Sequence, residues 1–425
     1  MALEFGIIQM IKRTNLKSTS TYFRFKLKTV LLLFLILYFP TFWGYTSLGT
    51  GQLIYLFAII VLTLPFFLET KSYRFPLPTI YKLFFLWSLT YIATLAIQPF
   101  INNEIILKDF SDILRPLFYL YFFIIGYVLG IKLEKSYFLV TSVVVLTLLS
   151  FIFDILKFNE SFQAITNLYA VFEYGELNYI RYSGTFGFCY NFGFVCLFGY
   201  AIALTFYSHK AITFFVSCIV MMLIGSRSVI LAFIIVTLLY FFVFSKISAL
   251  KKTIIIPIVI ALIIFLYIVA VTWEIPVVSD SIKYSERLIN ALSGKEADGS
   301  LGTRSGQLAV AIERLLKSIL FGVGPAKNNY PIEIQLGYYL SSWGIIGTIV
   351  FVSIQLNFFV VAARGLKLKD LFISKFSTAN LLWLISALIV GMSTPITDQI
   401  RVFQLYFLIQ GYQYGIIWPY RYYKS

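Results

Sequence analysis

Hydrophobic segments of membrane-spanning length recur along almost the whole chain, and this feature constrains the fold more than any other. A helix needs about 20 consecutive apolar residues to cross about 30 Å of hydrocarbon. With 60% hydrophobic residues, 12% charged residues and a mean hydropathy of +0.86, the chain cannot fold so that water meets only polar surface. We therefore expect an all-α, polytopic transmembrane protein that forms one integral membrane domain over residues 1–425.

About twelve spans satisfy the length criterion. They lie at residues 28–45, 52–68, 80–97, 113–131, 137–156, 185–207, 211–224, 229–245, 253–272, 336–363, 378–392 and 402–418. The apolar run 211–244 is too long for one crossing, so we expect it to turn at Gly225-Ser226-Arg227-Ser228 and to form a hairpin of two spans.

The distribution of lysine and arginine predicts the orientation of these spans, because positively charged loops are retained in the cytoplasm. Most of the 34 basic residues fall on one side of the predicted topology, which places both termini in the cytoplasm. The same bias accounts for the net charge of +15, so this charge does not indicate nucleic-acid binding. Two larger loops, 157–184 and 273–335, face the side opposite the cytoplasm and offer enough chain to build a polar site.

Both outer loops contain amphipathic helical patterns. In the first loop we expect a helix along the membrane surface, with apolar positions at Phe162, Ile165, Leu168, Tyr169 and Phe172. In the second loop, Thr303 or Ser305 can cap a helix that ends at Gly322. Its apolar stripe consists of Leu308, Ala311, Ile312, Leu315, Leu316 and Ile319. On pattern alone, these helices can equally serve only to order a long loop.

Residues that bind metals are scarce in this chain. The single histidine, His209, lies in a predicted cytoplasmic turn, and Cys189, Cys196 and Cys218 lie inside predicted spans as small apolar packing residues. We therefore expect no metal, no cofactor and no disulfide framework.

The first apolar run begins near Val30 and continues at spanning length, which predicts a first span and no cleavable signal peptide.

Four arginines stand at outer ends of predicted spans or in the outer loops. They are Arg181, Arg227, Arg304 and Arg401. An arginine near hydrocarbon costs on the order of 3 kcal/mol and persists mainly where it has a partner. A lipid-linked pyrophosphate is a suitable partner, because guanidinium binds phosphate through two parallel hydrogen bonds. The alternative is that each side chain extends to the headgroup region without a specific ligand.

Short motifs around these arginines follow one another in a fixed order. They are Arg181-Tyr-Ser-Gly-Thr-Phe, Gly225-Ser-Arg-Ser, Gly302-Thr-Arg304, Phe321-Gly-Val-Gly324 and Tyr339-Leu340-Ser-Ser-Trp-Gly344-Ile-Ile-Gly347. In order and placement, this set resembles the O-antigen polymerase (Wzy) family, which shares a superfamily with the O-antigen ligases. The resemblance extends over the whole layout, and its sharper motifs occupy residues 181–347.

The resemblance implies a polymerase of the bacterial inner membrane, with a GT-C-like fold and a periplasmic active site. Such an enzyme transfers the growing glycan from undecaprenyl pyrophosphate onto the non-reducing end of a newly flipped, undecaprenyl-pyrophosphate-linked repeat unit. A flippase and a chain-length regulator are the implied partners, together with membrane lipid. This glycosyltransferase reaction needs no metal where cations of the protein neutralise the departing pyrophosphate.

Roles in this reaction can be assigned to the outer charged residues as a hypothesis. Pyrophosphate binding and leaving-group stabilisation fall to Arg181, Arg227, Arg304 and Arg401, and Arg304 also counts as catalytic. Glu333 is the first choice of general base for the acceptor hydroxyl, because it ends the large loop beside the glycine-rich span. Asp398 and Glu286 are its alternatives. Each acid can also be a solvated loop residue without a catalytic role.

Other functions stay open at this point. Ligases of the superfamily typically carry a histidine near the outer end of the span after the large loop, where this chain has Gln335-Leu-Gly-Tyr, which favours a polymerase. A transporter or flippase of lipid-linked oligosaccharides is a rival with a similar number of spans, although we find no repeat between the two halves of the chain. A non-catalytic assembly partner is a third reading.

Overall fold

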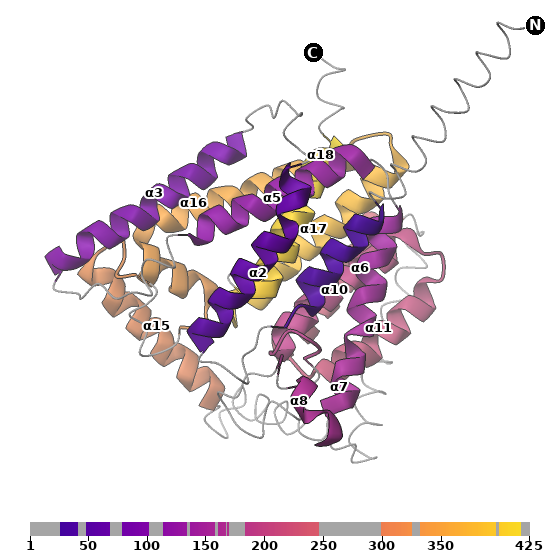
Figure 1. Ribbon diagram of the computed structural model, residues 1–425, viewed down its shortest axis with the longest axis horizontal. Coiled ribbons are helices and arrows are strands. Elements are labelled where there is room, and N and C mark those ends of the chain that lie inside the picture. The colour runs from indigo at the N-terminus through magenta and orange to yellow at the C-terminus, as the bar shows by residue number, and fades with distance from the viewer. Residues whose placement is uncertain are drawn as a thin grey trace, which may run out of the picture.

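The computed structural model describes residues 26–40, 48–68, 79–101, 114–133, 137–157, 160–166, 168–169, 183–245, 299–324, 332–396 and 399–417. Within these residues, every regular element is a helix (Figure 1), and the predicted all-α fold is confirmed. A helix over residues 26–38 comes first. The elements that follow are α2 (Leu48–Leu68), α3 (Thr79–Ile97), η1 (Gln98–Ile101), α5 (Arg115–Leu133), α6 (Tyr137–Leu149), α7 (Phe151–Lys157), η2 (Glu160–Phe162), α8 (Gln163–Thr166), α10 (Cys189–Phe206), α11 (Lys210–Ile224), α12 (Arg227–Leu239), η3 (Tyr240–Phe244), α15 (Gly299–Lys317), α16 (Gln335–Leu366), α17 (Leu371–Gly391) and α18 (Ile400–Ile417).

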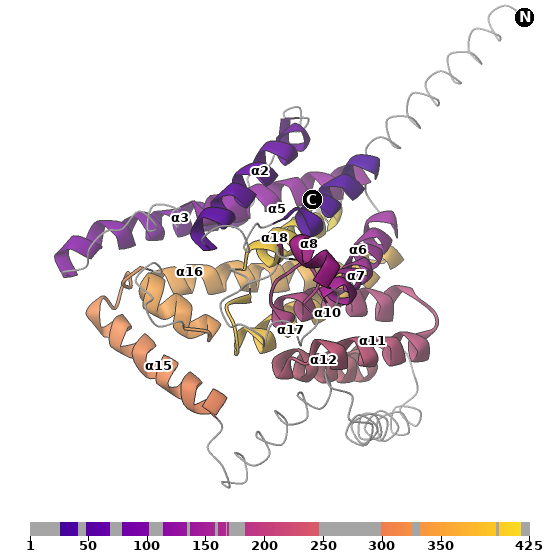
Figure 2. The same cartoon turned by 60° about the horizontal axis from the view of Figure 1, so that its bottom comes forward.

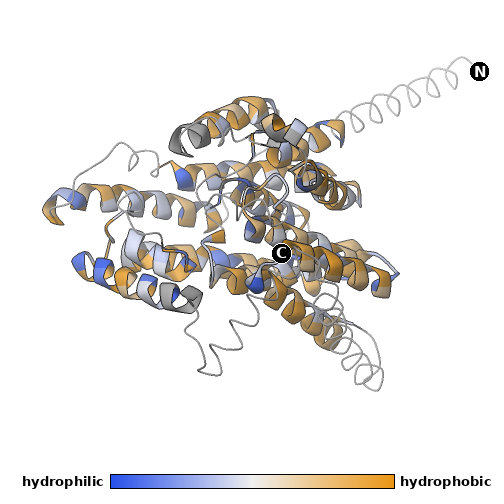
Figure 3. Cartoon of the chain, turned by 90° about the horizontal axis from the view of Figure 1, so that it is seen from below, coloured by the Kyte–Doolittle hydropathy of each residue, from blue (hydrophilic) through white to orange (hydrophobic). Residues whose placement is uncertain are grey.

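Seven helical segments in the described part of the chain are long and apolar enough to cross a membrane. They are Ile80–Ile101, Arg115–Leu133, Tyr137–Asp154, Cys189–Phe206, Arg227–Phe244, Gln335–Leu366 and Leu371–Gly391. Two shorter apolar helices, Ile54–Pro65 and Lys210–Ile224, lie among them, and Figure 3 shows hydrophobic residues along most of the helical surface. The chain is therefore a polytopic membrane protein. The span expected at 253–272 lies outside the described residues, and a helix is present at each of the others.

The helix ends gather into two groups. At one end of the bundle, Ser393 Oγ donates a hydrogen bond to Ser228 Oγ (2.7 Å) and joins the end of α17 to the start of α12. A Cβ added to Gly391 would lie 2.9 Å from Gln335 Oε1, which places the start of α16 at the same end. Because Arg227 and Arg401 also begin helices there, we call this the arginine end; it comprises residues 183–185, Arg227, Gln335, Gly391 and Arg401.

The opposite end of the bundle carries lysines and aromatic rings. The ring of Tyr137 lies 5.6 Å from that of Phe206 and 5.1 Å from that of Phe372, and Lys375 Nζ lies 5.8 Å from the centre of the Phe206 ring. We call this the lysine end. The two groups agree with the alternation of helix directions that the charge distribution predicts, while the membrane face of each group stays a prediction.

Helices α5 and α18 form the most extensive helix pair among the described elements. Gly126 and Gly130 of α5 face Gly411 and Gly415 of α18, and a Cβ at Gly126 would lie only 1.8 Å from the carbonyl oxygen of Leu408. Each sequence has two glycines four residues apart, so one face of each helix lacks side chains and the two backbones touch.

Buried amides join α17 to α18. Asn380 Nδ2 donates to Gln410 Oε1 (3.0 Å), and Gln410 Nε2 donates back to Asn380 Oδ1 (2.9 Å). Both side chains are fully buried. Inside a membrane, such a reciprocal pair satisfies polar groups that neither water nor lipid can reach.

The expected span 336–363 is interrupted. Gly344 of α16 has φ +63° and ψ −167°, a left-handed conformation that favours glycine and ends one helical segment before the next begins. Gly322 also has a positive φ, of +71°. A Cβ at Gly322 would lie 2.5 Å from the carbonyl carbon of Ser342, and one at Gly344 would lie 2.4 Å from that of Leu320. The two glycines thus allow two backbone segments to touch.

Four backbone hydrogen bonds connect these segments, residues 319–324 and 341–346. The amides of Val323 and Gly324 donate to the carbonyls of Ser341 and Ser342 (2.9 and 3.0 Å), and those of Ile345 and Ile346 donate to Ile319 and Leu320 (2.9 and 3.1 Å). Thr94 Oγ1 of α3 binds the carbonyl of Phe321 (2.6 Å). Peptide groups freed by the break are therefore satisfied by the segment that follows α15.

Helix α15 lies beside α16 at the edge of the bundle (Figures 1 and 2). It begins at Gly299 and ends at Lys317, so it starts before the predicted cap and stops before Gly322. Ala311 is buried against α16, whereas Leu316 is 67% exposed. The amphipathic helix is confirmed, and much of its predicted apolar stripe faces away from the protein.

Candidate functional site

Arg401 lies at the arginine end and is 3% exposed. Its two Nη atoms donate to the carbonyls of Leu37 and Phe39, at the end of the first helix. The guanidinium carbon also lies 5.2 Å from the ring centres of both Tyr55 and Tyr169. Arg401 therefore stabilises the carboxyl end of a helix, whose unpaired carbonyls attract a cation. This local role was not predicted, and its assignment to a pyrophosphate stays a prediction.

Tyr169, in the loop predicted to be the first outer one, lies against this arginine. Its hydroxyl donates to the carbonyl of Tyr38 (2.5 Å). Burial raises the pKa of Tyr169, and the positive charge of Arg401 opposes that shift. The phenol stays protonated at neutral pH and acts as a hydrogen-bond donor.

Arg304 on α15 has a different environment. Its side chain is half-buried, and its buried Nε has no hydrogen-bond partner among the described residues. One helical turn further, the buried Gln307 accepts a hydrogen bond from the backbone amide of Glu333 (3.1 Å) through its Oε1. The structure thus brings the segment of Glu333 next to the helix that carries Arg304, with the Glu333 side chain exposed.

Arg227 begins α12 directly after a sharp turn. Gly225 has φ +64° and closes α11 by donating its amide to the carbonyl of Met221 (3.2 Å). Ser228, the next residue after Arg227, accepts the hydrogen bond from Ser393 described above and lies 3.3 Å from Ser226 Oγ. The predicted turn between two apolar helices is confirmed, although α11 is shorter than a full span, and the turn places Arg227 at the arginine end.

Asp154 is a buried acid that sequence reasoning did not select. Its carboxylate is 1% exposed and accepts backbone hydrogen bonds from Ser183 (2.9 Å) and Gly184 (2.8 and 3.0 Å). These two residues belong to the motif that begins at Arg181. An aspartate inside a predicted span indicates a specific partner, and this signal could have selected it. Asp154 binds the backbone of Ser183 and Gly184, just before α10 begins.

Arg115 is a second residue that the sequence reading missed. It is the first residue of α5, and its Nη1 donates to the hydroxyl of Tyr338 (3.3 Å) in the first segment of α16. Its position at the predicted outer start of a span is the same signal that selected the other arginines.

The predicted site residues differ in where they lie. Arg181, Asp398 and Glu286 lie outside the described residues. Among the others, Arg304 and Glu333 share one neighbourhood, while Arg227 and Arg401 begin different helices at the arginine end. Within the described residues, no three His, Cys, Asp or Glu side chains gather in a way that suits a metal ion.

This arrangement can bind an anion and move a proton. A half-buried guanidinium whose Nε has no partner within the described part of the chain can donate to a phosphate oxygen, and an exposed carboxylate on an anchored backbone can accept a proton from a hydroxyl group. Both groups belong to the unit formed by α15 and the first segment of α16.

Comparison with known proteins supports the family resemblance. The O-antigen ligase family, Wzy_C, matches residues 212–348, which run from α11 to the second segment of α16 and include Arg227, Arg304, Glu333 and Gly344. No curated protein matches the chain. The match does not separate polymerases from ligases, since both share the superfamily. Residues 212–348 are therefore similar to the O-antigen polymerase and ligase superfamily, a class of membrane enzymes that process glycans.

Proposed function

We propose that the chain is a polymerase of lipid-linked oligosaccharide repeat units that works at the arginine end. The observation that carries the proposal is that Glu333 lies beside the helix that carries Arg304. Arg304 is half-buried, its Nε has no partner among the described residues, and it lies one turn from Gln307, which anchors the backbone of Glu333. Both residues fall inside the stretch that matches the O-antigen ligase family.

The proposed reaction replaces one bond at an anomeric carbon by another. The bond from that carbon to the pyrophosphate oxygen breaks, and undecaprenyl pyrophosphate leaves with the bonding electron pair. A hydroxyl oxygen of the incoming repeat unit forms the new glycosidic bond, and its proton passes to the Glu333 carboxylate. Arg304 and Arg227, with Arg181, stabilise the negative charge that develops on the leaving group.

The choice of polymerase over ligase follows from the position of the single histidine. His209 lies between α10 and α11 at the lysine end, whereas Gln335 begins α16 at the arginine end. A neutral amide cannot exchange a proton as an imidazole does. A ligase that relies on histidine at this point would lack its proton-transfer group in this chain. The ligase activity nevertheless stays the second candidate, because the matching family carries that description.

Purified protein in lipid vesicles, supplied with undecaprenyl-pyrophosphate-linked repeat units, separates these functions. We expect a ladder of polymers without any other acceptor. Products that form only when lipid A core is added would indicate a ligase. Movement of the substrate across the vesicle membrane without new glycosidic bonds would indicate a flippase. Either of these last two results would overturn the proposal.

Alanine and lysine variants of Arg181, Arg227, Arg304 and Arg401 test the leaving-group role in the same assay. For each arginine that stabilises the leaving group, we expect the alanine variant to have a kcat/KM about 10²- to 10³-fold lower than that of the wild-type protein. This is the usual cost of removing a hydrogen-bond donor to developing charge. Lysine should restore part of the activity, since it keeps the charge and loses the paired hydrogen bonds. Arg364→Ala, at the far end of α16, is the matched control and should leave the ladder unchanged. Full-length ladders from all four alanine variants would contradict the assignment.

A further inference from the structure

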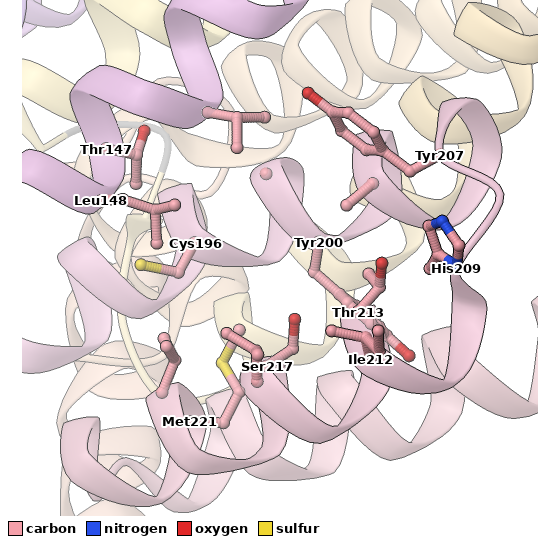
Figure 4. Close-up of a pocket in the computed structure, with 15 residues that line it drawn as sticks. Thr147, Leu148, Cys196, Tyr200, Tyr207, His209, Ile212, Thr213, Ser217 and Met221 are labelled. Atoms are coloured by element: carbon pink, nitrogen blue, oxygen red, sulfur yellow. The ribbon is translucent and has the colours of Figure 1, made fainter.

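A cavity of about 340 Å³ lies between α6, α10 and α11. Figure 4 shows Thr147, Leu148 and Cys196 toward one end of it and Tyr207 and His209 toward the other. Leu148 and Ile212 line the cavity and are yet 48% and 63% exposed. The cavity therefore opens sideways, on helix surfaces that a bilayer covers.

The walls present carbon atoms rather than hydrogen-bonding groups. Most lining residues are apolar, and two of the hydroxyls among them are already bonded inside the protein. Thr147 Oγ1 donates to the carbonyl of Val143 (2.7 Å), and the Tyr200 hydroxyl pairs with Thr237 Oγ1 (2.7 Å). A polar molecule would find few partners here, whereas a hydrocarbon chain would lose none.

Two glycines of α10 have different surroundings, and only one of them is explained by close helix packing. A Cβ at Gly193 would lie 2.7 Å from both methyl groups of Val229, so this glycine is needed for close packing with α12. A Cβ at Gly199, which lines the cavity, would meet no atom of the described residues within 4 Å. Close packing therefore does not require Gly199, and its missing side chain enlarges the cavity.

One end of the cavity lies next to the arginine end of the bundle. Thr147 lines it, and the carbonyl of Thr147 accepts a hydrogen bond from Ser150 Oγ (2.5 Å). That same Oγ would lie 3.1 Å from a Cβ at Gly184, the residue held by Asp154. On the neighbouring helix, the lining residue Met221 is bonded to Gly225, two residues before Arg227.

From this placement we infer that the cavity holds part of the prenyl chain of a polyprenyl diphosphate substrate. The inference rests on the proposed function. It matches the two halves of such a lipid to two adjacent surfaces: the diphosphate to the cationic arginine end, and the hydrocarbon to an apolar, laterally open space that begins one helical turn below it. A bilayer substrate can enter through the side without leaving the membrane.

Photo-crosslinking tests this placement. The protein is reconstituted in vesicles of phosphatidylethanolamine and phosphatidylglycerol with undecaprenyl diphosphate that carries a diazirine in its prenyl chain. We expect labelled peptides from α6, α10 and α11. Labelling confined to other helices would overturn the inference, and so would equal labelling of the cavity by a phosphatidylglycerol probe with a diazirine in its acyl chain.

A cavity-filling variant provides the second test. Gly199→Phe places a ring in open space, and we expect prenyl labelling and apparent substrate affinity to fall by about tenfold, equivalent to excluding about two methylene groups. Ala363→Phe adds the same ring at an exposed position near the lysine end of α16 and should change neither. Unchanged labelling in a folded Gly199→Phe protein would refute the placement.

The two proposals fail in different ways. If the chain is not a polymerase, no ladder forms with any variant, and the crosslinking pattern still reports whether the prenyl chain occupies the cavity. If only the cavity assignment is wrong, the wild-type protein polymerises and Gly199→Phe polymerises with the same KM.

Discussion

Glycine has opposite consequences in two regions of this protein. Between α5 and α18, a Cβ at Gly126 or Gly411 would lie within 2.0 Å of a backbone oxygen of the facing helix. Between α6, α10 and α11, a Cβ at Gly199 would lie more than 4 Å from every atom in the described part of the chain. The first region is built for contact between two parts of the chain, and the second leaves room for something else.

The difference follows from how helices associate in lipid. Hydrocarbon tails solvate an apolar helix as well as another helix does, so association depends on close packing and hydrogen bonds rather than on the hydrophobic effect. Missing side chains stabilise α5 against α18 because each backbone fills the space opposite it. Around Gly199 no atom of the described residues lies within 4 Å of an added Cβ, and a lipid chain can fill that space at little cost.

The largest expected effect comes from placing a side chain in the contact between α5 and α18. Gly126→Leu inserts a side chain where the Leu408 backbone lies, and we expect it to destabilise the folded protein by about 3 kcal/mol. Thermal unfolding in detergent, followed by circular dichroism, measures the change. Gly199→Leu is the control of equal size and should remain folded. Similar losses in both variants would remove the distinction between the two regions.

A smaller effect is expected for the polar contact between α17 and α18. Asn380→Leu and Gln410→Leu each leave a buried amide without its partner, and we expect a cost of about 0.6–1.7 kcal/mol for each. The double variant should cost less than the sum, because both amides are gone. Additive losses of unfolding free energy would show that the amide pair does not couple the two helices. A loss larger than that of Gly126→Leu would show that the amide contact matters more than the glycine contact.

The smallest effect should be a gain. Gly199→Ala adds one methyl group in open space within a helix, where alanine is favoured over glycine by about 0.5–1 kcal/mol. We expect a slightly higher unfolding temperature and almost unchanged prenyl labelling. A lower unfolding temperature would mean that another atom already occupies the position beside Gly199.

Hydropathy predicted the helical framework well. The alternation of helix directions, the hairpin turn at Gly225 and the amphipathic helix before Phe321 could all be derived from spacing and charge. These features depend on local sequence, since each helix must satisfy its own backbone in lipid. The contact of α5 with α18 could also have been found, because Gly126, Gly130, Gly411 and Gly415 are spaced for close helix packing.

The site was less predictable because its contacts join distant parts of the chain. Arg401 binds carbonyls of Leu37 and Phe39, and Asp154 binds the amide of Gly184. A sequence pattern shows that a buried charge needs a partner and does not show which partner it has. The break at Gly344 was missed for a related reason: a hydropathy window averages over about 20 residues, whereas the break depends on one torsion angle and on a remote glycine.

The interruption of α16 has a mechanical consequence. Since four peptide hydrogen bonds fasten residues 319–324 to residues 341–346, α15 cannot slide or tilt independently of the long segment that continues to Leu366. A displacement of Arg304 on binding an anion should therefore be passed through these hydrogen bonds to the second segment of α16. We expect α15 and that segment of α16 to move together when substrate binds.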